Sequence, residues 1–209
     1  MTGIVTTGYE TDRRLLETIT TYLASRTDGA ARRFRDAFDV DVGNWQAVPA
    51  NHLPAAETLV DAGPLSAGAE HDVVTAFACV RHALKWEQSY TKADGVVGDD
   101  MLNGYGFAEI VGKLGPFVSD KVRSGIGVWG PNIDYPAHSH GAEEVYVVVA
   151  GEAEFTVGDA PSAWRRTGDA VLVPSNTVHG FRTGTKPLVV LYVWQDGDLR
   201  EISTFQDSA

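Results

Sequence analysis

Cysteine is nearly absent from this chain of 209 residues, which contains only Cys79. A single cysteine excludes an intramolecular disulfide and a multi-cysteine metal site, and it disfavours an iron–sulfur cluster. Cys79 lies among Phe77, Ala78 and Val80, and these apolar neighbours predict a buried, inert thiol.

Long apolar runs and basic residues are also scarce. The longest uninterrupted apolar stretches, Val145–Ala150 and Leu188–Trp194, are much shorter than the ~18 residues that a membrane helix needs. The polar segment Met1–Arg14 lacks the apolar region of a signal peptide. With 17 Lys and Arg against 28 Asp and Glu, the net charge is -11, which disfavours binding to polyanions. We therefore expect a cytoplasmic protein that acts on a small molecule, with no nucleic-acid or membrane partner.

Apolar residues make up 44% of the chain, enough for a sizeable core, and in the first half they recur at helical spacing. Those between Leu15 and Leu23 fall on one face of a helix predicted over Asp12–Arg26, with Thr11 as its candidate N-cap. A short second helix is predicted around Phe34.

A longer helix is predicted over Glu70–Tyr90. Its apolar positions follow the spacing i, i+4, i+7, i+11 from Val73 to Leu84. The proline- and glycine-rich stretches 48–68 and 91–104 are predicted to be irregular connections.

After residue 104 the apolar period changes to two. Short runs of β-branched and aromatic residues are separated by glycine-containing segments, at 150–152 and 158–159, that are predicted to be turns. Evenly spaced short strands predict a sandwich or barrel. We therefore expect a mainly β fold, with a helical N-terminal extension over 1–100 and a β-barrel over 101–209.

Three of the six histidines, His138, His140 and His179, lie in the β half. Residues two apart in a strand face the same side, so the first two point together, and Glu144 can return to that side after a bend. Imidazoles and a carboxylate that converge in a barrel make a site for one divalent transition metal ion: zinc, iron, manganese, cobalt or nickel. Glu143 is expected to face away, as solvated surface.

The other three histidines are His52, His71 and His82. They lie in the helical half, without acidic or histidine partners at ligand spacing along the chain. We expect ordinary packing or surface roles for them.

The metal-site residues lie within a recognisable pattern. The stretch Gly130-(x7)-His138-x-His140-x3-Glu144-x6-Gly151 resembles the first motif of the cupin superfamily, apart from two extra residues after the first glycine. This resemblance implies that the two histidines and the glutamate are metal ligands.

A second stretch, Gly168-x5-Pro174-x-Asn176-x2-His179-x3-Thr183, resembles the second cupin motif. Asn176 replaces a glycine there, and Thr183 replaces an asparagine. The glycine position needs a turn geometry that asparagine also tolerates. The two motifs together imply a cupin double-stranded β-barrel, or jelly roll, with His179 as the remaining ligand.

More of the chain resembles one branch of the superfamily, the cupin-type dimethylsulfoniopropionate lyases. The resemblance is carried by the stretch Tyr135–Tyr146 and by a helical extension that contains Trp86-Glu87-Gln88-Ser89-Tyr90. It implies a carbon–sulfur lyase that splits this zwitterionic sulfonium into dimethyl sulfide and acrylate. It also implies Tyr135 as the base that removes the proton α to the carboxylate, with Tyr146 near the metal and as the alternative base.

The reaction fits these residue types. A divalent cation on the carboxylate would stabilise enediolate-like charge, and it would lower the pKa of a neighbouring tyrosine. Aromatic faces hold a sulfonium cation. The candidates are Trp129, Tyr192 and Trp194 on strands, with Trp86 and Tyr90 placed four apart on one helix face to cover the barrel mouth.

Two alternatives stand beside this interpretation. One is another metal-dependent cupin enzyme: an iron dioxygenase, or an isomerase of a phosphorylated sugar. The isomerase would need cations in the cavity, and the barrel strands offer few, mainly Arg165, Arg166 and Arg182. The other is a non-enzymatic cupin that binds a small ligand. A homodimer is compatible with the sequence.

Overall fold

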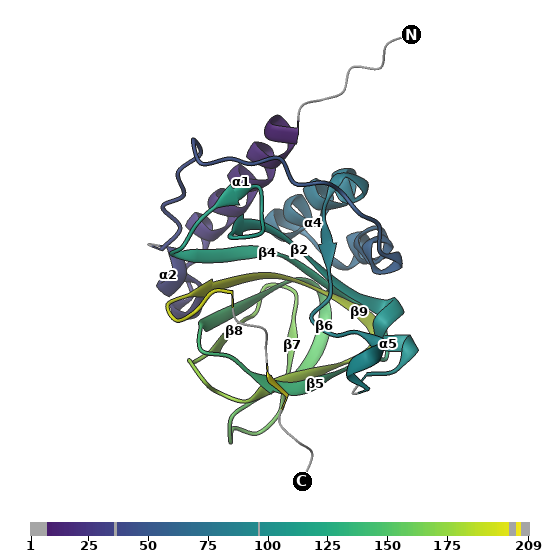
Figure 1. Cartoon of the computed structure of the whole chain (residues 1–209). Helices are drawn as coiled ribbons and strands as arrows, with labels where there is room; N and C mark the ends of the chain where they lie inside the picture. The colour runs from purple at the N-terminus through teal and green to yellow at the C-terminus, as the bar shows by residue number, and fades with distance from the viewer. Residues whose placement is uncertain (1–7, 36, 96, 201–203, 206–209) are drawn as a thin grey trace.

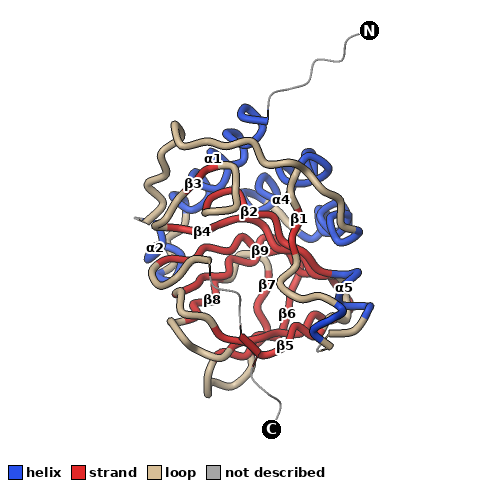
Figure 2. Tube along the Cα trace, viewed as in Figure 1, coloured by secondary structure: helices blue, strands red, loops and turns tan. Residues whose placement is uncertain are grey.

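A computed structural model describes residues 8–35, 37–95, 97–200 and 204–205, with helices in the first part of the chain and strands in the second (Figures 1 and 2). The α-helices are α1 (Gly8–Ser25), α2 (Gly29–Arg35), α3 (Thr58–Ala62), α4 (Gly68–Val80) and α5 (Asp99–Gly104). Short 3-10 turns are η1 (Pro54–Glu57), η2 (Gly63–Leu65), η3 (Arg81–Ala83) and η4 (Lys92–Asp94). None of these described helices is long and apolar enough to span a membrane.

The strands form one branched sheet. They are β1 (Trp86–Glu87), β2 (Tyr105–Gly112), β3 (Phe117–Val118), β4 (Val122–Trp129), β5 (Asp134–Ser139), β6 (Glu143–Val157), β7 (Ala163–Arg166), β8 (Ala170–Val173), β9 (His179–Gln195) and β10 (Thr204–Phe205). One path runs β1-β2-β4-β9-β5-β10, while β6 pairs with β7, β8 and β9. The mainly β fold with an N-terminal helical layer is therefore confirmed.

Two long antiparallel strands, β6 and β9, organise the barrel. They pair from Glu143 opposite Gln195 to Val157 opposite His179. The second half of β9 also pairs with β4 and its first half with β5, so that β5 lies across the interior from the β2–β4 layer (Figure 1). Gly151, predicted to be a turn, instead lies within β6 at an irregularity in the pairing, where its φ of 79° favours glycine.

The helices α1 to α4 pack on the outer face of the β2–β4–β9 layer (Figure 2), and none of their residues lines the inner cavity. Their apolar faces share one core with outward-facing strand residues such as Val145, Val147 and Leu191. The period of two along β6 and β9 sends these side chains outward and the alternate ones inward. The inward residues form a second core around the candidate site.

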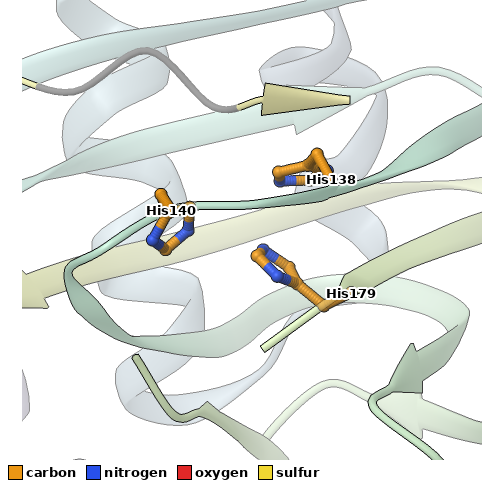
Figure 3. A group of neighbouring side chains, drawn as sticks. All are labelled: His138, His140 and His179. Carbon is orange, nitrogen blue, oxygen red and sulfur yellow. The ribbon is translucent and has the colours of Figure 1, made fainter. Parts of the chain in front are cut away.

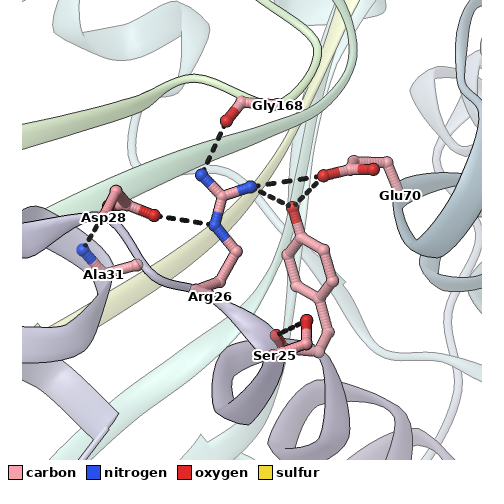
Figure 4. Close-up of polar contacts among 7 residues, drawn as sticks. Ser25, Arg26, Asp28, Ala31, Glu70 and Gly168 are labelled. Atoms are coloured by element: carbon pink, nitrogen blue, oxygen red, sulfur yellow. Dashed lines mark hydrogen bonds and ion pairs between the residues drawn. The ribbon is translucent and has the colours of Figure 1, made fainter.

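Arg26 fastens the helical layer to the barrel (Figure 4). Its guanidinium donates to Asp28, to Glu70 of α4 and to the backbone oxygen of Gly168, which lies in the turn between β7 and β8; the distances are 2.8, 3.2 and 2.6 Å. The side chain is only 13% exposed, so these contacts lie largely out of water.

Several local predictions are corrected by these contacts. The first helix begins at Gly8, so Thr11 lies inside it and is not its N-cap. The helix predicted over Glu70–Tyr90 ends at Val80, because the backbone of Trp86–Glu87 pairs with β2 and cannot also be helical. Cys79 is exposed, because it lies two residues from the buried Phe77 and therefore on the opposite side of α4.

Candidate metal centre

Adjacent strands bring the predicted site residues together on the inner face of the sheet. Arg123 on β4 stands opposite Trp194 on β9, which in turn stands opposite Glu144 on β6. In the neighbouring row, Tyr192 stands opposite Tyr146. The predicted shared orientation of Tyr146 with Glu144, and of Tyr192 with Trp194, is confirmed.

The turn before β9 supplies the third histidine. Asn176 adopts a φ of 56°, the left-handed conformation expected where cupins carry glycine. Thr183 donates to the backbone oxygen of Gly130 at 2.8 Å and accepts from the Ile133 amide at 2.8 Å. Both departures from the cupin motifs are therefore accommodated by local hydrogen bonds and turn geometry.

His138, His140 and His179 face one common space, with their candidate ligand atoms all within 4.8 Å of one another (Figure 3). Each Nδ1 atom points at a backbone carbonyl: that of Pro136 at 2.8 Å, Ala142 at 3.0 Å and Thr177 at 2.9 Å, respectively. A carbonyl only accepts, so each Nδ1 carries the proton, and in a neutral ring the Nε2 lone pair is then free for a metal ion. This is the tautomer that a metal ligand needs.

Glu144 completes the cluster. Its Oε2 lies 3.0 Å from Nε2 of His140 and 3.6 Å from Nε2 of His179. Burial alone would raise the pKa of Glu144, but the hydrogen bond with His140 and the nearby His179 outweigh burial and hold the pKa well below its usual value. Burial, followed by the neighbouring His179, lowers the pKa of His138 to about 3. The cluster therefore combines an ionised Glu144 carboxylate with a neutral His138 imidazole.

This donor set fits a divalent cation. His140 has an oxygen acceptor beside each ring nitrogen, so it needs either a second proton or a cation on its Nε2 side. The buried Nε2 of His179 has no hydrogen-bond partner among the described residues. Three nitrogens and a carboxylate at this spacing are suited to zinc, iron, manganese, cobalt or nickel.

Both predicted tyrosines adjoin the cluster and are buried. The Tyr135 ring lies 5.0 Å from that of His138, and the Tyr146 ring lies 6.1 Å from that of His179. Burial is the main cause that raises the pKa of each tyrosine well above its ordinary value; the Tyr146 hydroxyl is also hydrogen-bonded to Glu144.

The inner cavity has a volume of about 1080 Å³ and reaches from the cluster to the surface. Trp129, Tyr192 and Trp194 line it, as predicted. Tyr90 packs against Tyr135 at 5.9 Å and belongs to the same inner core.

The structure does not bring Trp86 to the cavity. Trp86 is buried in the core under the helices, where its indole donates to the backbone oxygen of Arg81 at 2.8 Å. The predicted helical pair of Trp86 and Tyr90 fails because Trp86 lies on a strand and the two rings enter different cores. The loop residues Gln88 and Ser89 line the cavity instead.

Two further polar residues of the cavity, Arg123 and Glu109, were missed by the sequence analysis. The expected barrel cations Arg165, Arg166 and Arg182 are all exposed, whereas Arg123 lies in the cavity and pairs with Glu109 at 2.7 Å. The period of two along β4, which places residue 123 on the same face as Trp129, was the available signal.

Glu143 also departs from its expectation as solvated surface. It is 8% exposed and bonded to Arg33 of α2 and to Gln195, each at 2.8 Å. It faces away from Glu144, as expected, but the helical layer covers that side of the sheet. The pair therefore helps to hold α2 on the barrel.

The helical half contains a second histidine group that spacing along the chain did not suggest. His52, Glu57 and His82 lie close enough for one ligand atom of each to fall within 4.8 Å of the others. Both histidines are exposed, and Glu57 also binds Arg81 at 3.0 Å. This group lies outside the barrel and its cavity.

Comparisons with known proteins agree with this geometry. The family model for dimethylsulfoniopropionate lyase matches residues 26–190. The lyase DddQ of Ruegeria pomeroyi is 33% identical over 132 residues, covering 60% of this chain and 64% of that protein. The putative lyase DddL of Cereibacter sphaeroides is 30% identical over 142 residues, covering 64% of this chain and 55% of that protein. The matches thus span less than two thirds of each relative's length.

Solved structures extend the similarity over nearly the whole chain. A chain from the crystal structures of the DMSP lyases RdDddP and RnDddQII has a TM-score of 0.84 at 29% identity, covering 96% of this chain and 100% of that one. DddQ from Ruegeria pomeroyi has a TM-score of 0.82 at 26% identity, covering 94% and 96% of the two chains. Since the family match also includes all four residues of the histidine–glutamate cluster, this chain belongs to the dimethylsulfoniopropionate lyase family.

Proposed function

We propose that this protein is a metal-dependent carbon–sulfur lyase that cleaves dimethylsulfoniopropionate to dimethyl sulfide and acrylate. The observation that carries the proposal is the buried group of three imidazoles around Glu144, with two tyrosines beside it in one cavity. The family and the two structural relatives, which are DMSP lyases, support the class of reaction.

The reaction needs a base and a way to stabilise charge. A base takes the proton α to the carboxylate, the electron pair forms the carbon–carbon double bond, and the sulfur leaves as neutral dimethyl sulfide. A divalent metal ion held by the four residues of the cluster would supply Lewis acidity toward the carboxylate and a positive charge that favours tyrosinate.

We assign the base to Tyr135. Its ring lies 5.9 Å from that of Tyr90 and 5.0 Å from that of His138, so it adjoins the cluster without belonging to the ligand set. Burial, followed by Tyr90 and Tyr105, raises its pKa, so the chain alone keeps this phenol protonated. Activity should therefore depend strictly on the bound cation.

Tyr146 takes a different role in this proposal. Its hydroxyl is hydrogen-bonded to Glu144 and therefore holds that carboxylate in place. We expect it to position the carboxylate and the substrate, and it becomes the base if Tyr135 proves dispensable.

The sulfonium end needs apolar, electron-rich surroundings. Trp129 forms edge contacts with Tyr135 at 5.3 Å and with Phe181 at 4.9 Å, and Tyr90 adjoins the same group. Aromatic faces attract a methylated cation by roughly 0.5–2 kcal/mol per contact. We place the dimethylsulfonium group against this aromatic wall, away from the cationic end of the site.

The direct test is turnover with defined metal content. The full chain is stripped with a chelator, reloaded with zinc, iron, manganese, cobalt or nickel, and incubated with dimethylsulfoniopropionate. We expect dimethyl sulfide and acrylate in equal amounts, and only with metal. His140→Ala and His179→Ala should lose both metal and turnover, while the control His71→Ala, an exposed position, should keep both. A metal-loaded protein that releases neither product would overturn the proposal.

A further inference from the structure

The cavity contains a buried guanidinium that the proposed mechanism does not use. Arg123 lines the cavity together with His138 and Glu144 of the cluster, and its side chain is 13% exposed. Nε donates to Glu109 at 2.7 Å, whereas Nη1 and Nη2 donate to no residue in the described part of the chain. Two donors of a buried cation are therefore available to a ligand.

The guanidinium is held in one orientation. Glu109 is anchored by the backbone amides of Leu114 and Gly115, at 2.8 and 2.9 Å, and it binds Arg123 through its other oxygen. The Arg123 Cζ atom also lies 5.6 Å from the Phe107 ring and 5.0 Å from the Trp194 ring. Because the guanidinium of Arg123 is already held at Nε and packed against two rings, it loses little conformational entropy when its terminal nitrogens bind an acceptor.

A neighbouring hydroxyl lacks a partner. Tyr192 precedes Trp194 by two residues on β9, so both side chains share the inner face with Arg123. The Tyr192 hydroxyl is buried, and no described residue offers it a hydrogen bond. A buried hydroxyl without a partner is costly, and one that lines a cavity points to a ligand that supplies the missing bond.

We propose that Arg123 and Tyr192 form a carboxylate-binding subsite in the outer part of the cavity, specific for small monocarboxylates. Two parallel N–H groups match the two oxygens of a carboxylate, and the phenol adds a third donor. Under the proposed function the ligands are the carboxylate of the incoming substrate and the departing acrylate. The subsite lies outside the metal-site residues, because the Trp194 ring, which stacks on His140, separates that histidine from Arg123.

The same cation orients a zwitterion. A sulfonium is repelled by Arg123, so a substrate at this subsite presents its carboxylate to the guanidinium and keeps its methyl groups away from it. A methylated cation without a carboxylate gains nothing here. The subsite therefore selects for carboxylates before any bond is broken.

The test measures binding rather than turnover. Propionate and acrylate are titrated by calorimetry into the full chain, both as isolated with its metal and after chelation. Arg123→Met is combined with Glu109→Gln, so that no buried charge loses its partner; Tyr192→Phe keeps the ring and removes only the hydroxyl. We expect propionate affinity to fall at least tenfold in the double variant and about two- to tenfold in Tyr192→Phe, in both metal states.

The matched control is His140→Ala, which removes a proposed metal ligand and keeps Arg123 and Tyr192. In the absence of metal, its affinity for propionate should equal that of the original protein without metal. Unchanged affinity in Tyr192→Phe and in the double variant, or no saturable propionate binding by the original protein, overturns the subsite. Failure to release dimethyl sulfide would overturn the lyase proposal alone, because the titration requires no reaction.

Discussion

The imidazole of His140 stacks on the indole of Trp194, with ring centroids 3.9 Å apart and planes inclined by 24°. The guanidinium carbon of Arg123 lies 5.0 Å from the centroid of the same indole. An indole covered by two neighbours has little face left for a sulfonium, so we interpret Trp194 as the support that orients His140.

Trp194→Ala should therefore weaken metal binding, about 10- to 100-fold, the usual cost of losing a residue that orients a ligand. A chelator-competition titration measures this affinity directly. Trp164→Ala is the control, since that tryptophan is 45% exposed on β7. An unchanged metal affinity with weaker substrate binding would instead make the indole a substrate contact.

Tyr135→Phe should lower turnover by at least the ~10²-fold typical of losing a general base, with metal content and substrate affinity nearly unchanged. Tyr146→Phe should weaken substrate affinity along with rate, because the hydrogen bond to Glu144 is lost. Single-turnover elimination at saturating substrate separates the two variants, with metal occupancy checked in each. Near-normal elimination by Tyr135→Phe would move the role of base to Tyr146.

The metal-free protein should lose stability below pH 6.5. Burial and the neighbouring His179 lower the pKa of His138 from 6.5 to about 3 in the folded chain, so this histidine binds a proton on unfolding between these pH values. The free energy of unfolding should then fall with decreasing pH, by about 1.4 kcal/mol per pH unit for this one proton. The pKa of Glu144 is also lowered, but its contribution is lost only below its ordinary value of 4.5, so the window from pH 6.5 to 5 separates His138 from Glu144.

Urea unfolding at several pH values within that window measures the slope. His138→Phe should flatten it, while His71→Phe, at an exposed position of α4, should not. An equal slope in His138→Phe and in the original metal-free protein would contradict the assignment.

Arg26→Met should destabilise the fold by about 1–3 kcal/mol, because Glu70 and the Gly168 carbonyl each lose a donor in a poorly hydrated place. Thermal or urea unfolding measures the change. Arg13→Met on the exposed side of α1 breaks helix-surface ion pairs only and should have a much smaller effect. Equal effects of the two substitutions would mean that Arg26 does not fasten the helices to the barrel.

Strand periodicity and the spacing of the candidate ligands could be predicted from the sequence, because both depend on residues that are close together along the chain. Alternation alone placed Glu144 and Tyr146 on one face, and the two-residue spacing brought His138 and His140 together. The φ of Asn176 could likewise be anticipated, since the departure from glycine left a residue that tolerates the left-handed region.

Contacts between distant segments could not be read in the same way. Trp86 and Tyr90 are four apart, as on one face of a helix, yet pairing with Ala108 of β2 draws Trp86 into a strand. The side chain of Glu143 points away from the barrel interior, as the alternation predicts. It is nevertheless buried, because α2 packs over it, and the sequence did not indicate that packing. The proximity of His52 to His82 likewise depends on a loop and the distant turn η3, which meet in space.

The sequence by itself determined the mainly β fold, the convergence of three histidines with Glu144 and the two tyrosines beside them, because short motifs in strands fix which side chains share a face. Only the tertiary structure decided where the helices pack, which aromatic rings enter the cavity, and that Arg123 lies beside Tyr192. The physical reason is burial. The surroundings of a side chain depend on which distant segment covers it, and the local pattern of apolar residues does not indicate which segment that is.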